Sequence, residues 1–229
     1  MTLDALGTLV ELDRPAPRLV AELRARGIEA SEAQAGAALG EEIAYYRAHH
    51  DLGADAASLE RLRTRCAEVL RVALQRAGVE VRGEPGAVRV RDALLAALRF
   101  APFDDVPAAL AELRAAGHRL VVVSNWDVSL HDMLRTTGLD KLVDGAISSA
   151  EAGVRKPAPG IFHRALALAG GDGDVGDALH AGDSLALDVA GALGAGMRAV
   201  LVARAVAPEG VPGDVPVVRS LAGLAALAA

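Results

Sequence analysis

The sequence predicts an α/β protein, with a parallel sheet covered by helices and an all-helical block inserted near its start. Two observations support this fold. Between residues 104 and 205, short β-rich apolar runs alternate with helical patterns, which is typical of a parallel sheet with helices on its faces. Residues 15–100 instead carry Ala- and Leu-rich helical patterns with little strand pattern, so they form a separate helical block.

The composition excludes several classes of protein. Hydrophobic residues make up 52% of the 229 residues, which suffices for a sizeable core and argues against disorder. The formal net charge of −6 disfavours a general nucleic-acid binder. No stretch approaches the roughly 18 apolar residues of a membrane helix, and one cysteine, Cys66, excludes an internal disulfide. We therefore expect a cytoplasmic protein with neither nucleic acid nor membrane as partner.

The N-terminal part predicts one short strand followed by helices. Only Met1, Thr2 and Leu3 precede Asp4, whereas a buried strand usually has about five residues. Gly27 is suited to ending the first helix of the inserted block. The expected helices of this block cover residues 17–26, 31–49, 58–77, the last ending before Gly78, and 87–98.

The second part predicts the alternating elements of the sheet. Residues 104–107 (DDVP) predict a helix start, with acids at the cap and proline in the first turn, and Gly117 predicts its end. The segment 118–123 (HRLVVV), which ends in four apolar residues, then predicts a buried parallel strand. The elements expected after it are strands at 178–181 and 198–202, with a helix over 185–193 between them.

Two short segments place polar groups at strand ends. Asp4 follows the first strand and precedes a Gly-Thr turn, so its carboxylate is expected at the crevice where open α/β sheets bind ligands. Ser124 ends the apolar run Val121–Val123 and could donate a hydrogen bond to a substrate oxygen. Taken singly, Asp4 is better explained as a residue that caps a turn, and Ser124 is equally well explained as the cap of the next helix.

Two further segments carry opposite charges. Lys156 precedes a proline-rich helix start and is one of only two lysines in the chain. Asp183 and Asp188 lie on either side of a predicted strand–helix junction, where both carboxylates can face the same crevice. Oxygen ligands of this kind suit a hard cation such as Mg²⁺.

In this order and context, the four segments resemble the motifs of the haloacid dehalogenase-like superfamily. Those motifs are an Asp before Gly-Thr, a strand-terminal Ser or Thr, a Lys, and a closing acidic pair. The resemblance implies a Rossmann-like, doubly wound parallel sheet formed by residues 1–14 and 101–229. It further implies that residues 15–100 are a helical cap domain, as in the helical-cap branch of the superfamily.

The resemblance also implies roles for individual residues. Asp4 would be the nucleophile that forms a covalent aspartyl intermediate. Ser124 and Lys156 would position the substrate and neutralise its developing charge, with Asn125 beside them in the substrate-binding set. The substrate would be a small molecule, and the protein a monomer or a homodimer.

In the phosphatase branch of the superfamily, the resemblance implies a bound Mg²⁺. Asp4 and Asp183 would hold it together with the backbone carbonyl of Leu6, and Asp188 would act as a ligand or support the site. We therefore expect a Mg²⁺-dependent hydrolase that removes phosphate from a small phosphorylated metabolite.

Leu6 departs from the phosphatase pattern. Phosphatases of the superfamily have a second Asp at this position, which protonates the leaving group and later activates water. Leucine can do neither, and losing a general acid/base costs about 10²–10⁴ in rate. Asp127, or His49 and His50 in the helical block, are possible substitutes.

Two other functions stay open at this point. In a metal-free 2-haloacid dehalogenase the halide leaves as an anion, so Leu6 is tolerable and Arg14 or Arg18 could bind the substrate carboxylate. The other open function is that of a non-catalytic binding protein that keeps the fold. A phosphonatase is excluded because residues 10–110 contain no lysine for a Schiff base.

Overall fold

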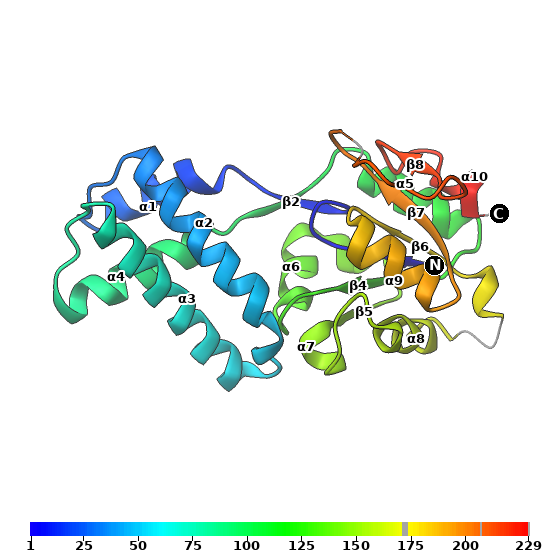
Figure 1. Ribbon diagram of the computed structural model, residues 1–229, viewed down its shortest axis with the longest axis horizontal. Coiled ribbons are helices and arrows are strands. Elements are labelled where there is room, and N and C mark those ends of the chain that lie inside the picture. Colours follow the sequence, from blue (N-terminus) through cyan, green and yellow to red (C-terminus); the bar gives the residue numbers. More distant parts are fainter. Residues whose placement is uncertain (171–173, 207, 229) are drawn as a thin grey trace. The chain divides into compact units, whose positions relative to one another are not determined.

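The computed structural model describes residues 1–170, 174–206 and 208–228 and consists of two compact units (Figure 1). One unit comprises Met1–Glu11 and Ala101–Ala229, and the other comprises Leu12–Phe100. The chain passes from one to the other through a two-stranded ribbon of β2 (Val10–Leu12) and β3 (Phe100–Pro102).

The larger unit contains a six-stranded parallel sheet with the strand order β5-β4-β1-β6-β7-β8. Its strands are β1 (Thr2–Leu3), β4 (Val121–Ser124), β5 (Gly145–Ser148), β6 (Leu179–Gly182), β7 (Arg198–Val202) and β8 (Val217–Val218). Although β1 has only two residues, it lies in the middle of the sheet, and its Thr2 pairs with Val121 on one side and His180 on the other. The predicted α/β fold with a parallel sheet is confirmed.

Helices flank this sheet. The α-helices are α5 (Val106–Ala115), α6 (Leu130–Thr137), α7 (Ser149–Ala152), α8 (Pro159–Leu168), α9 (Ala190–Gly194) and α10 (Leu224–Ala228), with 3₁₀ turns at Leu139–Lys141 and Val175–Asp177. Strand alternation directs Val121 and Val123 into a core with Phe162 of α8 and Ala192 of α9. Helices α8 and α9 therefore cover one face of the sheet, next to each other (Figure 1).

Two predicted elements of the larger unit differ in detail from the structure. The strand expected over 118–123 begins only at Val121, where its ladders with Thr2 of β1 and Gly145 of β5 begin. The helix expected over 185–193 is a π-helical turn (Leu185–Val189) followed by the short α9. In that turn the N–H of Ala190 donates to the carbonyl of Leu185, five residues back.

The smaller unit consists mainly of helices: α1 (Pro15–Ala25), α2 (Glu32–His49), α3 (Ala56–Arg76), α4 (Gly83–Ala97) and a 3₁₀ turn (His50–Leu52). Buried leucines such as Leu23, Leu70 and Leu94 form its core. Helix α3 begins earlier than the predicted Ser58 because Asp55 caps it, accepting a hydrogen bond from the Ser58 N–H.

No helix within the described ranges combines the length and apolar character needed to cross a membrane.

The aspartate before α5 has a different role from the one predicted. Asp105 occupies the N-cap position, but its side chain makes no cap hydrogen bond. Its carboxylate instead accepts hydrogen bonds from Ser220 Oγ (2.7 Å), the Leu221 N–H (2.6 Å) and Arg204 Nη1 (2.6 Å). Arg204 also donates to the carbonyl oxygen of Thr8 (2.7 Å). Asp105 and Arg204 thus tie the chain beyond β7 to the turn that follows Asp4.

This network predicts a pH-dependent contribution to stability. Burial alone would raise the pKa of Asp105, but hydrogen bonds from Ser220, Arg204 and Leu221 outweigh burial and lower it. Because the pKa is lower in the folded state, the stabilisation is present above the unfolded pKa of about 3.9 and is lost as pH falls through the folded value. Asp105→Asn should therefore cost about 1–3 kcal/mol of unfolding free energy at pH 7 and progressively less below about pH 4.

Urea denaturation at several pH values measures this difference. The neighbouring Asp104 is exposed, so Asp104→Asn is a matched control that should stay within about 0.5 kcal/mol of the wild type. A cost for Asp105→Asn that does not change with pH would show that the carboxylate charge is unimportant.

Candidate active site

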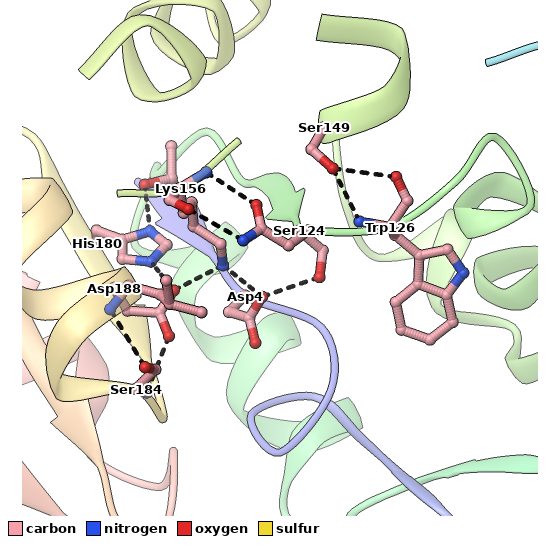
Figure 2. A network of polar contacts seen from close by, with 11 residues as sticks. Asp4, Ser124, Trp126, Ser149, Lys156, His180, Ser184 and Asp188 are labelled. Atoms are coloured by element: carbon pink, nitrogen blue, oxygen red, sulfur yellow. Dashed lines mark hydrogen bonds and ion pairs between the residues drawn. The ribbon is translucent and has the colours of Figure 1, made fainter. Parts of the chain in front are cut away.

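The four chemically distinctive segments converge at one edge of the sheet (Figure 2). Asp4 directly follows β1, Ser124 ends β4 and Asp183 directly follows β6, so all three lie at the carboxyl ends of adjacent parallel strands. Lys156 comes from the loop before α8, and its Nζ reaches the Asp4 carboxylate. This is the edge where open α/β sheets bind their ligands.

Asp4 is held by two donors on one of its oxygens. Its Oδ1 accepts a hydrogen bond from Ser124 Oγ at 2.9 Å and another from Lys156 Nζ at 2.5 Å. Within the described ranges no donor reaches Oδ2. Asp4 is only 6% exposed, so its carboxylate is both fixed in orientation and nearly removed from bulk water.

Lys156 is a buried cation between two carboxylates. It is 2% exposed, and its Nζ lies 2.6 Å from Asp188 Oδ1 as well as 2.5 Å from Asp4 Oδ1. Burial alone would lower the pKa of Lys156, but the charges of Asp4 and Asp188 outweigh burial and raise it. The ammonium therefore stays charged.

The two carboxylates that share this ammonium differ in pKa. Burial raises the pKa of Asp4, and Lys156 acts in the opposite direction. Burial would also raise the pKa of Asp188, but Lys156 and His180 outweigh it and hold that pKa below its usual range. Asp188 is therefore the firmly ionised partner of the ammonium.

Asn125 contacts the backbone of Lys156. Its Oδ1 accepts a hydrogen bond from the Lys156 N–H at 2.8 Å, and its Nδ2 donates to the Lys156 carbonyl at 3.1 Å. This pair of hydrogen bonds fixes the loop that carries the ammonium. The predicted substrate contact of Asn125 stays a prediction, and the geometry favours a role through Lys156.

Three carboxylates could hold a metal ion. Asp4, Asp183 and Asp188 each offer an oxygen within 4.8 Å of the others, and such a set of hard oxygen donors fits Mg²⁺. Asp183 is exposed at the edge of the site, but partial desolvation of its carboxylate, with the negative charges of Asp4 and Asp188, raises its pKa to about 7. A bound divalent cation would reverse that effect. Leu6, predicted to offer its backbone carbonyl, lies two residues after Asp4 and is 36% exposed.

Two glycines make room for the carboxylates. A Cβ on Gly182 would lie within 2.6 Å of Asp188 Oδ2, and a Cβ on Gly7 would overlap the Asp183 carboxylate. Gly7 also has a φ of +85°, in the region that favours glycine. The Gly beside each acidic motif is therefore a steric requirement of the site.

The sequence analysis did not identify the contacts of two residues with the acidic set, or the contact of Thr2 with one of those two residues. His180 of β6 is fully buried, with Nε2 3.1 Å from Asp188 Oδ1 and Nδ1 2.8 Å from Thr2 Oγ1. The backbone N–H of Ser184 donates to Asp188 Oδ2 at 2.9 Å. The available hint was a histidine inside an otherwise apolar strand.

The suggested substitutes for the missing acid have partners of their own. Asp127 is buried and accepts a hydrogen bond from the Ser129 N–H at 2.7 Å. In the helical unit, His50 Nδ1 lies 2.8 Å from Asp51, and His49 Nδ1 lies 2.8 Å from the Tyr45 carbonyl. These contacts do not favour any of these three residues as the general acid/base that Leu6 lacks.

The arginines suggested for binding a carboxylate both lie near the start of α1. Arg18 donates to the side chain and the carbonyl of Asp13. Arg14 precedes α1 in a left-handed backbone conformation with a φ of +45°. Arg18 thus already binds a carboxylate of its own chain.

At one edge of the parallel sheet, the site combines a buried carboxylate, a lysine that contacts one of its oxygens, and an acidic set. This combination is typical of one class of hydrolase. The chain belongs to the haloacid dehalogenase-like hydrolases, whose family pattern matches residues 1–196.

Several curated proteins are similar to this chain over part of its length. The chain is 45% identical over 96 residues to haloacid dehalogenase-like hydrolase domain-containing protein 3 of Bos taurus, covering 42% of this chain and 38% of that protein. It is 32% identical over 102 residues to glyceraldehyde 3-phosphate phosphatase of Methanothermobacter thermautotrophicus, covering 44% of each. The match thus spans less than half the length of these relatives.

The fold is also similar to that of L-2-haloacid dehalogenase from Xanthobacter autotrophicus. The TM-score is 0.70 at 22% sequence identity, covering 99% of this chain and 96% of that one. This likeness shows the fold alone.

The steric role of Gly182 is testable by substitution. Gly182→Ala should displace the Asp188 carboxylate and cost about 1–3 kcal/mol of unfolding free energy, because the added methyl group has no space. Gly194 of α9 is a matched control, since a Cβ there would meet nothing within 4 Å. Gly194→Ala should leave stability unchanged or raise it slightly. Equal unfolding free energies for the two variants in urea would contradict the packing argument.

Proposed function

We propose that this hydrolase is a Mg²⁺-dependent phosphatase that acts on a small phosphorylated metabolite through an aspartyl-phosphate at Asp4. The observation that carries the proposal is the arrangement around Asp4. Lys156 and Ser124 both donate to Asp4 Oδ1, and the carboxylates of Asp183 and Asp188 lie close enough to Asp4 to share a metal cation with it. A metal-free displacement of halide would not require the Asp183 carboxylate.

In the proposed reaction, a carboxylate oxygen of Asp4 attacks phosphorus as the bond from phosphorus to the leaving-group oxygen breaks. The leaving group departs as an anion and takes a proton from solvent. Water then attacks the aspartyl-phosphate, releasing phosphate and regenerating the carboxylate. Lys156 and Ser124 orient Asp4 and offer positive charge and a hydrogen bond where negative charge develops. Bound Mg²⁺, held by Asp4, Asp183 and the Leu6 carbonyl, would let the two anions approach each other.

Relatives support the phosphatase class. Two curated relatives are named for phosphatase activity, glyceraldehyde 3-phosphate phosphatase and N-acylneuraminate-9-phosphatase. The helical unit at 12–100 occupies the place in the chain of a helical cap, and we propose that it selects the substrate.

A second candidate is a metal-free 2-haloacid dehalogenase, and the observation that favours it is Leu6. A halide departs without needing a proton, so a leucine two residues after the nucleophile would cost nothing in that reaction. The substrate and the ion requirement therefore separate the two functions.

The first functional prediction concerns Asp4. With Mg²⁺ the wild type should hydrolyse an aryl phosphate such as p-nitrophenyl phosphate, and excess EDTA should abolish this. Asp4→Asn should lose the activity, because an amide is a poor nucleophile. Circular dichroism verifies that the variant folds. Full activity of Asp4→Asn would exclude the covalent mechanism, and turnover of a 2-haloacid in EDTA would establish the dehalogenase instead.

The second functional prediction concerns Leu6. Without a proton donor, the first step depends on how well the leaving group departs as an anion, so aryl and acyl phosphates should react much faster than alkyl phosphates. Leu6→Asp should raise the alkyl phosphate rate by up to about 10²-fold. Since Leu6 is 36% exposed, the new carboxylate need not be buried.

A matched control places the same charge elsewhere in this unit. Leu193 of α9 is 40% exposed, and Leu193→Asp should leave the ratio of aryl to alkyl rates unchanged. If the wild type already cleaves alkyl phosphates as fast as aryl phosphates, another residue donates the proton and this interpretation of Leu6 is wrong.

A further inference from the structure

His180 is a polar residue in the most buried part of the sheet. It lies in β6, has no exposed surface, and packs edge-on against Phe162 with ring centroids 5.0 Å apart. None of the four family motifs includes it. A buried imidazole needs hydrogen-bond partners for both ring nitrogens, and these partners determine which nitrogen carries the proton.

The two ring nitrogens of His180 have different partners. Thr2 is the direct cross-strand partner of His180, and its Oγ1 lies 2.8 Å from Nδ1. Nε2 lies 3.1 Å from Oδ1 of Asp188. An ionised carboxylate can only accept, so Nε2 must donate, and in the neutral ring Nδ1 then accepts from the Thr2 hydroxyl.

Asp188 is therefore fixed by donors on both of its oxygens. Oδ1 accepts from His180 and from Lys156 Nζ at 2.6 Å, and Oδ2 accepts from the Ser184 N–H at 2.9 Å (Figure 2). The same Lys156 ammonium reaches Asp4 at 2.5 Å. A rotation of the Asp188 carboxylate would thus move the ammonium away from Asp4.

We propose that His180 is a positioning residue that, held by Thr2, orients Asp188 so that Asp188 directs the Lys156 ammonium onto Asp4. In this proposal Asp188 binds mainly Lys156. Asp4 and Asp183 are then the carboxylates most available to bind a metal cation. The effect on catalysis rests on the proposed function, whereas the effect on Lys156 does not.

The composition of the chain allows a direct test without activity. Lys156 is buried and the only other lysine, Lys141, is exposed. In protein labelled with ¹⁵N at lysine Nζ, the protected ammonium of Lys156 should give a ¹H–¹⁵N signal, assigned by its loss in Lys156→Arg. His180→Leu, which removes the donor, should shift or abolish this signal. His180→Gln, which can keep a donor toward Asp188, should preserve it better.

His163 of α8 provides the matched control. Its Nε2 lies 3.3 Å from the Ala195 carbonyl, away from the acidic set, so His163→Leu should leave the Lys156 signal unchanged. An unchanged Lys156 signal in folded His180→Leu would overturn the proposal. Ring ¹⁵N shifts of the wild type give a test that needs no folded variant: a His180 ring without a proton on Nε2 would also overturn it.

Kinetics then separate positioning from general damage. With Mg²⁺ and an aryl phosphate, His180→Leu should lower kcat about 10-fold with little change in KM, and His180→Gln should recover part of the loss. A loss confined to KM would count against positioning. If the wild type hydrolyses no phosphate but His180→Leu still shifts the Lys156 signal, the proposed function fails while the positioning role stands.

Discussion

The site depends on one buried cation, the ammonium of Lys156, lying between Asp4 and Asp188. Without it, two carboxylates would face each other out of water, and both could not stay ionised. The choice of residue is informative, because the chain uses arginine almost everywhere else and has only two lysines. A compact ammonium on a flexible stem can serve two carboxylates at one point, whereas a planar guanidinium favours paired contact with one.

Residues of β6 support the ion pair between Lys156 and Asp188. Strand β6 supplies His180 as a donor to Asp188 and, two residues later, Gly182 as the space that Asp188 needs. Both contributions come from the alternation of side chains along one strand. The π-helical turn that follows carries Asp188 back over the end of that strand, with the Ser184 N–H holding its other oxygen. The acidic motif is thus one continuous strand–turn unit.

Local patterns sufficed to predict the parallel sheet and the four polar segments, because an apolar run followed by a polar residue is visible within a few positions. The ladder limits of β4 were not predictable, since they depend on the two-residue β1 pairing far away in sequence. The same holds for His180, whose partner Thr2 is 178 residues distant. The hydrogen bonds of Asn125 to the Lys156 backbone likewise exist only once two distant loops meet.

The central position of β1 has a consequence for how the molecule is assembled. In the described residues, the partners of this strand begin at Val121 on one side and His180 on the other, so β1 is enclosed on both sides only after it has met two segments distant in sequence. Contacts between such distant segments form slowly, because a long loop must close before any of them is gained. Although β1 precedes its partner strands in the sequence, it is therefore placed late in folding, and Asp4 reaches Lys156 only when these distant segments have met.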